Sequence, residues 1–228
     1  MDENSDGSTA GGDDSSPALQ PPKETDRAAT GTEGLDFVLN GGLPRHRAYL
    51  IQGPPGSGKT TFALQFCLAG AQRGERVLYV TACETEEEVR LVARSHGWSL
   101  DGMEVHYHDV RKYLGEEPQQ SVFHPAEVEL PRTIEGLLSV IERADPDRLV
   151  IDSLSEIRLM ASDPRWFRRQ MLSLKEKLAD RRCTTMFCDD RLKLDEPMHS
   201  IIHGVVELHQ LNSEYGPDRR QLRVAKLR

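Results

Sequence analysis

A glycine-rich loop between two apolar segments constrains the fold of this chain most strongly. Residues 53–60 read GPPGSGKT and fit the pattern GxxxxGK[ST], in which glycines let backbone N–H groups approach phosphate without interference from a Cβ. An apolar run at 48–51 precedes the loop, and apolar residues at helical spacing follow it at 62–68. This order predicts the start of an α/β domain that binds a phosphorylated ligand. A chance match of the pattern is the alternative, at roughly 1% per chain of this size.

The motif gives its residues separate roles. We expect Lys59 to reach the β- and γ-phosphates of ATP and Thr60 to place its hydroxyl on Mg²⁺, close to the positive end of the following helix. ATP and Mg²⁺ are therefore the expected cofactors. The predicted nucleotide contacts of this segment are Gly53, Gly56, Ser57, Gly58, Lys59, Thr60 and Thr61.

An aspartate follows another apolar segment. Residues 149–151 read LVI and are followed by Asp152, at the place where an acid at a strand end holds Mg²⁺ through water in phosphate-loop proteins. The alternative is a helix cap, because aspartate is common where a strand passes into a helix. The preceding phosphate loop favours the metal role, so Thr60 and Asp152 are the predicted metal residues.

Short apolar segments alternate with longer segments of helical spacing, which predicts a mostly parallel, twisted sheet flanked by helices. Helix boundaries are marked by Thr85 with Glu88, by Gly97 and by Asp163 before a proline. Two final segments with a turn at 215–218 predict a C-terminal antiparallel hairpin. The expected strands are 48–51, 77–80, 105–107, 149–151, 184–187, 205–211 and 221–227, and the expected helices follow the loop at 53–60 and cover 85–97, 133–144 and 163–178.

Length and composition favour one domain with a tail. A chain of 228 residues holds one α/β core, here 31–228, and residues 1–30 are predicted to be a disordered acidic tail. The net charge of −8 argues against a large nucleic-acid surface. We find no apolar run of membrane-spanning length and expect a cytoplasmic protein. The four cysteines lie in apolar stretches without CxxC spacing, so we expect packed, reduced thiols and no structural metal.

Several further motifs surround the phosphate loop: TG at 30–31, GLD at 34–36, GGLP at 41–44, ARSHGW at 93–98, VFHPAEVEL at 122–130 and DSLSE at 152–156. They resemble the KaiC-like branch of the RecA-fold ATPases, also described as circadian-clock-type, although no clock role follows from the resemblance. The resemblance covers nearly all of 31–228. The resemblance implies a RecA-type phosphate-loop fold and a homo-oligomer, commonly a hexameric ring, with ATP hydrolysed between neighbouring subunits. The family normally continues beyond the segment that ends here at Arg228.

The closing segment VAKLR at 224–228 resembles the strand that offers a lysine and an arginine to the neighbour's γ-phosphate in that family. Lys226, Leu227 and Arg228 are accordingly expected at the nucleotide, with Lys226 and Arg228 on one face of the strand as catalytic cations. A solvated edge strand is the alternative reading. Ser95 matches a family position near the neighbour's nucleotide base, or it makes only a local hydrogen bond at a helix end.

The chain departs from the family where two adjacent glutamates often end the second strand. Cys83 stands at the first position and Glu84 at the second. A neutral thiol is a poor proton acceptor, so either Glu84 acts as general base or turnover is slow. We expect catalysis by Glu84, Lys59, Lys226 and Arg228, with slow hydrolysis. Asp189 and Asp190 lie where such folds often sense the γ-phosphate. Two carboxylates there would repel phosphate unless a metal ion or Arg191 bridges them, so a structural or loop-capping role is the alternative.

The sequence therefore predicts a slow, regulatory ATPase that assembles with nucleotide at its subunit boundaries and has a protein partner that the sequence does not identify. A non-catalytic ATP-binding signalling module is the alternative, favoured by Cys83. A filament on single-stranded DNA would need basic loops and stacking aromatics, and the sequence offers neither.

Overall fold

The computed structural model describes residues 26–113, 125–161, 163–190, 197–211 and 219–228. The acidic segment at 1–25 and the predicted turn at 215–218 lie outside these residues, as does the first part of the VFHPAEVEL motif. Across the described ranges, every helix is too short or too polar to span a bilayer.

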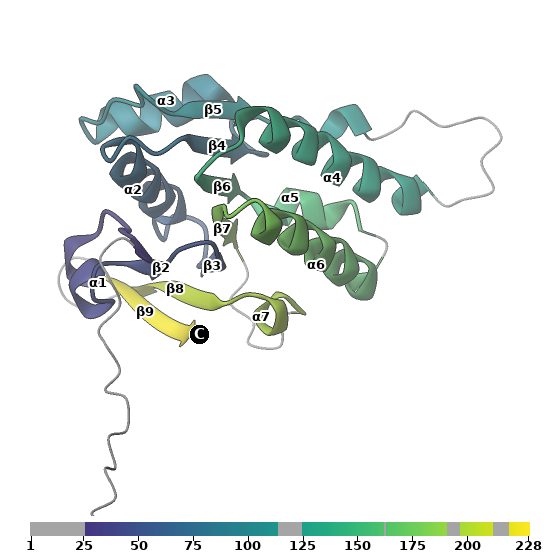
Figure 1. The fold of residues 1–228 in the computed structure, drawn as a ribbon. Helices are drawn as coiled ribbons and strands as arrows, with labels where there is room; N and C mark the ends of the chain where they lie inside the picture. The colour runs from purple at the N-terminus through teal and green to yellow at the C-terminus, as the bar shows by residue number, and fades with distance from the viewer. Residues whose placement is uncertain (1–25, 114–124, 162, 191–196, 212–218) are drawn as a thin grey trace, which may run out of the picture.

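A seven-stranded sheet forms the centre of the molecule (Figure 1), in the order β5-β4-β6-β7-β3-β8-β9. Neighbouring strands are parallel except for the final pair, β8 and β9, which form the predicted antiparallel hairpin. The strands are β3 (Ala48–Gln52), β4 (Val77–Thr81), β5 (Glu104–Tyr107), β6 (Arg148–Asp152), β7 (Thr184–Asp189), β8 (Gly204–Leu211) and β9 (Arg219–Leu227). The predicted fold class is confirmed.

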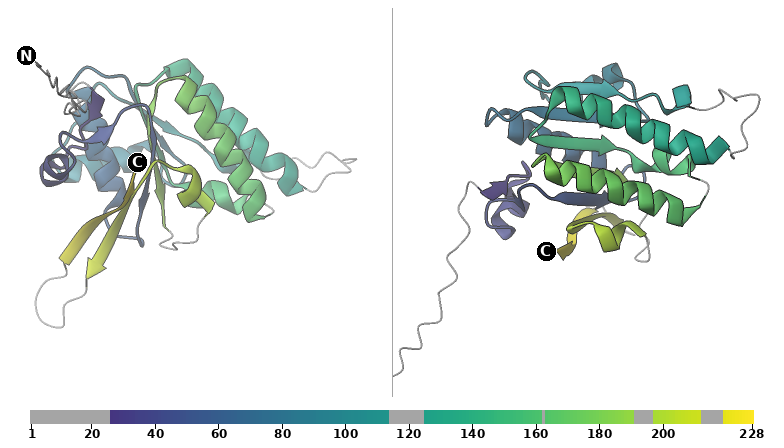
Figure 2. Two further views of the ribbon diagram at one scale, coloured as in Figure 1. Left: turned by 60° about the horizontal axis from the view of Figure 1, so that its bottom comes forward. Right: turned by 45° about the vertical axis from the view of Figure 1, so that its right-hand side comes forward.

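Helices cover both faces of the sheet (Figure 2), because side chains of a buried strand alternate between two apolar layers. Leu50 and Ile151 face the layer formed by α4, α5, α6 and α7, whereas Tyr49 and Val150 face α1, α2 and α3. The helices are α1 (Glu33–Val38), α2 (Lys59–Ala71), α3 (Glu86–Ser95), α4 (Pro125–Ala144), α5 (Leu154–Leu159), α6 (Pro164–Asp180) and α7 (Pro197–Ile201), with a 3₁₀ turn at Val110–Tyr113.

Three predicted helix boundaries are confirmed by their hydrogen bonds or backbone angles. Thr85 and Glu88 form a reciprocal capping box at the start of α3, and Gly97, after the end of that helix, has φ +74°. Asp163 caps α6 by accepting from the N–H groups of Arg165 and Trp166. The predicted start of α4 was wrong, since this helix begins at Pro125 rather than 133 and contains Pro131.

The predicted boundary of the tail at residue 30 was also wrong. Arg27–Ala28 forms a short strand, β1, which pairs with β2 (Leu43–Pro44). Ala28 and Thr30 are fully buried. A Cβ at Gly42 would lie 2.2 Å from the carbonyl oxygen of Ala28, so only glycine allows the two strands to approach this closely. The sequence did not predict this pairing, because the two strands are too short to show an apolar pattern and the segment before them is polar.

A buried arginine joins the start of β6 to the layer of α2. The Arg148 side chain is completely buried, and its guanidinium donates to the Glu75 carboxylate at 2.6 Å and 3.1 Å. It also donates to the carbonyls of Ala29, at 2.6 Å, and Phe66, at 2.9 Å. A Cβ at Gly70 of α2 would lie 2.6 Å from this side chain, so glycine leaves room for the guanidinium. No local sequence pattern predicts this network.

Candidate nucleotide-binding site

The predicted phosphate loop connects the end of β3 to the start of α2. Gly56 has φ +80° and Gly58 has φ +100°, both in the left-handed region that favours glycine. Gly53 is required for another reason: a Cβ there would lie 2.4 Å from Ser57 Oγ and 2.6 Å from the Leu208 carbonyl oxygen. The glycines therefore fix the path of the loop.

Lys59 begins α2, and its side chain is buried under the loop. Its ammonium group donates to the carbonyl oxygens of Gly53 at 2.9 Å and Pro54 at 3.1 Å. It also forms an ion pair with Asp190 at 2.7 Å. The loop thus folds around the ammonium group and holds it at the end of the sheet, where the predicted phosphates would lie.

Thr60 and Asp152 lie together, as their common metal role predicts. The Thr60 hydroxyl donates to Asp152 Oδ2 at 2.8 Å, and the Tyr79 hydroxyl donates to the same oxygen at 2.7 Å. A hydroxyl that donates a hydrogen bond to a carboxylate keeps the lone pairs of its oxygen for a cation, and Mg²⁺ prefers oxygen ligands. These residues therefore fit a magnesium ion. No cluster of three metal-binding side chains occurs among the described residues, and a phosphate-loop magnesium ion does not require one.

Two further predicted loop residues have different surroundings. Ser57 Oγ is buried and, within the described part of the chain, has no hydrogen-bond partner. Such a group is costly to bury unless a ligand or water completes its hydrogen bonds. Thr61 is half-buried, one residue after the metal-side threonine. Both lie in the predicted segment.

Tyr79 is a site residue that the sequence analysis missed. It lies in β4, next to β6, and parallel register places it beside the strand that ends in Asp152. Burial, followed by the charge of Asp152, raises the pKa of Tyr79 well above its usual range, so the hydroxyl stays protonated and donates. Only the strand order could have identified it.

Cys83 and Glu84 follow the end of β4. Cys83 is exposed, which corrects the expectation of a packed thiol, and its sulfur lies 3.6 Å from Ser153 Oγ. The other three cysteines are buried and free, as expected. Glu84 is half-buried, and its backbone is held by Thr81, whose hydroxyl donates to the Glu84 carbonyl at 2.8 Å. Burial, with the charges of Asp152 and Glu88, raises the pKa of the Glu84 carboxyl group.

Asp189 and Asp190 have different partners. Asp189 is fully buried and accepts from both terminal nitrogens of Arg158 in α5. Asp190 is partly exposed, pairs with Lys59 and accepts from the Ser155 hydroxyl at 3.1 Å. Asp189 is thus paired with Arg158, whereas Asp190 is paired with the lysine of the loop. Arg191, which the sequence analysis considered as a bridging cation, lies outside the described residues.

The remaining predicted contacts do not join this site within one copy. The Arg228 N–H donates to the His203 carbonyl, near the start of β3 and at the opposite end of that strand from the loop. Lys226 donates to the carbonyls of His199 and Ile202 at the end of α7, and Leu227 is exposed. Ser95 donates to the Val92 carbonyl at 2.7 Å, the local bond considered for it.

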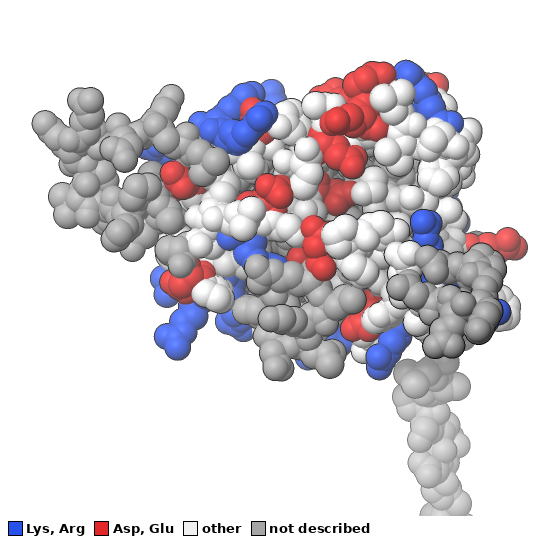
Figure 3. Space-filling model, turned by 180° about the vertical axis from the view of Figure 1, so that it is seen from behind, with Lys and Arg blue, Asp and Glu red and all other residues white. Residues whose placement is uncertain are grey.

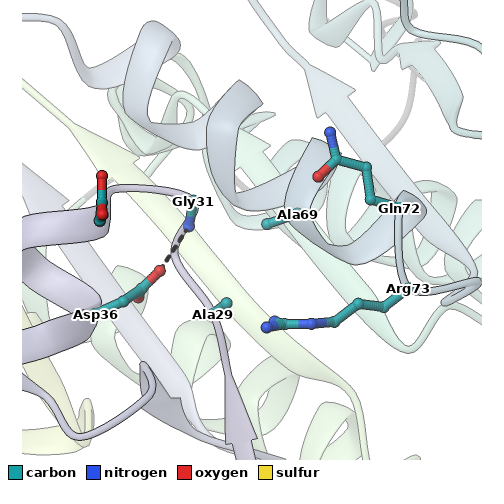
Figure 4. A pocket seen from close by; sticks show the side chains of 7 residues that line it. Ala29, Gly31, Asp36, Ala69, Gln72 and Arg73 are labelled. Carbon is teal, nitrogen blue, oxygen red and sulfur yellow. Dashed lines mark hydrogen bonds between the residues drawn. The ribbon is translucent and has the colours of Figure 1, made fainter.

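A separate hollow lies at the other end of α2 (Figure 4), with a volume of about 360 Å³. Gln72 and Arg73 line it from the end of the helix, opposite Glu33 and Asp36 of the α1 region. The Asp36 carboxylate accepts from the backbone of Thr30 and Gly31, which closes the lead-in segment around α1. A helix of 13 residues, about 20 Å long, separates this hollow from the phosphate loop.

A comparison with protein families shows to which family the chain belongs. The family model described as "ATPase: KaiC" matches residues 28–228. The chain belongs to the KaiC ATPase family. The match begins at Ala28, close to the start of the short strand β1, and includes the phosphate loop together with Asp152.

Several curated proteins are similar to this chain. A UPF0273 protein of Methanopyrus kandleri is 35% identical, over 71% of this chain and 66% of its own length. A UPF0273 protein of Thermotoga maritima is 29% identical, over 89% of this chain and 87% of its own length. Circadian clock protein KaiC3 of Synechocystis is 32% identical over 75% of this chain. The matched part is only 34% of that longer relative.

Proposed function

We propose that this chain binds Mg²⁺-ATP at residues 53–60 and hydrolyses it slowly, as a regulatory KaiC-like ATPase. The observation that carries the proposal is the 2.8 Å hydrogen bond between Thr60 and Asp152, next to the buried ammonium group of Lys59. A hydroxyl, a carboxylate and an ammonium group are the three side chains that a phosphate-loop enzyme needs around the metal and the terminal phosphates.

Each of these groups has a defined task. Loop N–H groups and Lys59 bind and orient the phosphates, while Thr60 and Asp152 hold the magnesium ion, which neutralises charge on the phosphates when bound. Glu84 is the proposed general base, since its raised pKa makes it a better proton acceptor than an ordinary carboxylate. The thiol of Cys83 cannot assist it as a second carboxylate would, which supports slow turnover.

We propose that the nucleotide lies between two copies in a homo-oligomer, with a hexameric ring as the expected form. Arg228 and Leu227 are exposed at the far end of the sheet, where a second copy can approach them. Lys226, Leu227, Arg228 and Ser95 would then contact the neighbour's nucleotide. Membership of the KaiC family supports this arrangement. The proposed setting is cytoplasmic, with an unidentified protein partner and no membrane or nucleic acid.

A non-catalytic ATP-binding signalling module is the second candidate. The presence of Cys83 favours it, because loss of a positioned base typically lowers turnover by about 10²–10⁴-fold without abolishing binding. In that case ATP would serve as a ligand that selects one assembly or conformation over another.

Phosphate release and light scattering, measured together with Mg²⁺-ATP, test the proposal. The variants are Lys59→Ala, Glu84→Gln and Cys83→Glu. Glu87→Gln is the matched control, because this exposed acid lies in the first turn of α3 and, among the described residues, its ion pair is with Arg94 at 3.4 Å. We expect slow turnover in the wild type and in the control, no turnover in Glu84→Gln and faster turnover in Cys83→Glu.

The outcomes separate the two candidates. ATP-dependent assembly without turnover in any variant would support the signalling module. If Lys59→Ala binds ATP as tightly as the wild type does, the proposed phosphate site is wrong.

A further inference from the structure

The ion pair between Lys59 and Asp190 places a carboxylate in competition with phosphate. Asp190 follows β7, the neighbour of β3 in the sheet, so its side chain meets the loop from the adjacent strand. Asp190 Oδ1 lies 2.7 Å from Lys59 Nζ. The lysine side chain is 8% exposed and the aspartate side chain 41% exposed, so one buried cation is paired with an anion that solvent can reach.

The ammonium group of Lys59 is already surrounded by acceptors. A lysine ammonium has three N–H donors. Two of them are directed at the carbonyls of Gly53 and Pro54, and Asp190 Oδ1 forms an ion pair with the same group at 2.7 Å. A phosphate group at Lys59 must therefore share the ammonium charge with this carboxylate or displace it, and the carbonyls belong to the loop itself. Asp190 is the partner that can leave without unfolding the loop.

Asp190 has a second contact that keeps it near the lysine. Its Oδ2 accepts from the Ser155 hydroxyl at 3.1 Å, and its backbone N–H donates to the same hydroxyl at 3.4 Å. These contacts hold the carboxylate beside the place where phosphate would bind. Because two anions cannot share one cation without repulsion, phosphate and the Asp190 carboxylate exclude each other there.

We propose that Asp190 is an internal competitor of phosphate for Lys59, and that it sets the affinity of the loop for nucleotides. This inference rests on the proposed function of the loop. Binding of the polyphosphate exchanges one anion for another at the ammonium group, so only the difference between the two ion pairs contributes to affinity. Asp190 thereby weakens nucleotide binding while stabilising Lys59 when no phosphate is bound.

Titration calorimetry of Asp190→Asn with ATP and with inorganic tripolyphosphate tests the proposal. We expect both ligands to bind about fivefold tighter than to the wild type, since the competing ion pair is lost. Tripolyphosphate shows whether the effect belongs to the phosphates rather than to the base or ribose. Asp180→Asn is the matched control, because it removes the same charge from an exposed position at the end of α6 and should not change either affinity.

A second variant and a second measurement keep the proposal testable if Asp190→Asn folds poorly. Asp190→Ser also removes the carboxylate and should tighten binding in the same direction. Thermal unfolding should show a lower midpoint without ligand for both variants and a larger increase on adding ATP than for the wild type.

Two negative results have different meanings. If the wild type binds ATP through Lys59 and neither Asp190 variant binds tighter, the competition is refuted while the function stands. If the wild type and Lys59→Ala fail alike to bind tripolyphosphate, the phosphate site itself is refuted.

Discussion

Glu84 lies where its surroundings oppose its negative charge. Burial, followed by the charges of Asp152 and Glu88, raises the pKa of its carboxyl group above the ordinary value of 4.5. Ionisation is therefore harder in the folded chain than in the unfolded chain. The resulting loss of stability is complete above the folded pKa and disappears below 4.5.

We predict that Glu84→Gln raises the free energy of unfolding at pH 7 while it lowers ATP turnover. Glutamine keeps the shape of the side chain but has no charge to desolvate and cannot accept the proton. Urea unfolding at pH 7 and at pH 4 measures the first effect, and the difference between variant and wild type should shrink at the lower pH. A difference in stability between variant and wild type that is the same at pH 7 and at pH 4 would contradict this account of the raised pKa.

At the scale of elements, Arg148 joins parts of the chain that are distant in sequence. It lies at the start of β6 and bonds to Glu75, after α2, and to Ala29 in the lead-in segment. Burial alone would raise the pKa of Glu75, but hydrogen bonds and charges from Arg148 and Arg45 outweigh it and lower this pKa to about 2. The stability from this pair is thus present above pH 4.5 and is lost as the pH falls toward 2.

We predict that Arg148→Met lowers the free energy of unfolding by about 3–5 kcal/mol at pH 7, because Glu75 and two carbonyls lose their buried donor. Arg181→Met is the control, since Arg181 pairs with Glu142 at the surface at 2.8 Å, and should cost below about 1 kcal/mol. Urea unfolding compares the two variants. A loss at Arg148 no larger than at Arg181 would show that the buried network contributes little.

Helices and strands that show a local sequence pattern, such as apolar periodicity or a cap, were predicted from that pattern. The strands from β3 to β9 have continuous or alternating apolar residues, and α3 and α6 have recognisable caps. By contrast, α1, α5 and α7 have six, six and five residues, too few for a helical period to be visible. Arg148 could not be predicted as buried, because arginine is ordinarily exposed and its partners come from three separate segments.

The same distinction holds for the site. Lys59 and Thr60 belong to one short motif, and Asp152 follows a strand of typical pattern, so the sequence indicated all three. Tyr79, Arg158 and Asp190 gain their roles from neighbours across strands β4, β6 and β7. Strand order is a property of the whole sheet, and no local pattern specifies it.

At the scale of the whole molecule, acidic groups and the closing strand occupy different regions. Acidic side chains gather toward the top of the face in Figure 3, where α3 lies, and the first turn of α3 contains Glu86, Glu87 and Glu88.

Arg228 lies near the start of β3, whereas the phosphate loop follows the end of that strand. A nucleotide bound at the loop of one copy is therefore remote from the Arg228 backbone of the same copy.

Because the phosphate loop and Arg228 lie at opposite ends of β3, the proposed role of Arg228 can be tested by mixing two inactive variants. Lys59→Ala and Arg228→Met should each abolish turnover alone, the first through its own loop and the second through the neighbour's site. Arg228→Met is preferable to a change at Lys226, because Lys226 also donates to the carbonyls of His199 and Ile202 at the end of α7 and its loss would disturb that helix.

When the two inactive variants are mixed in equal amounts and reassembled, we predict that turnover returns to about a quarter of the wild-type value. In head-to-tail contacts, random assembly combines an intact loop with a neighbour's intact Arg228 at that fraction of boundaries. Phosphate release measures the recovery. Mixing Lys59→Ala with Glu84→Gln is the control, because both changes damage the loop side of a boundary and no combination restores an intact site. If the first mixture stays as inactive as the control, Arg228 does not act across a boundary between copies.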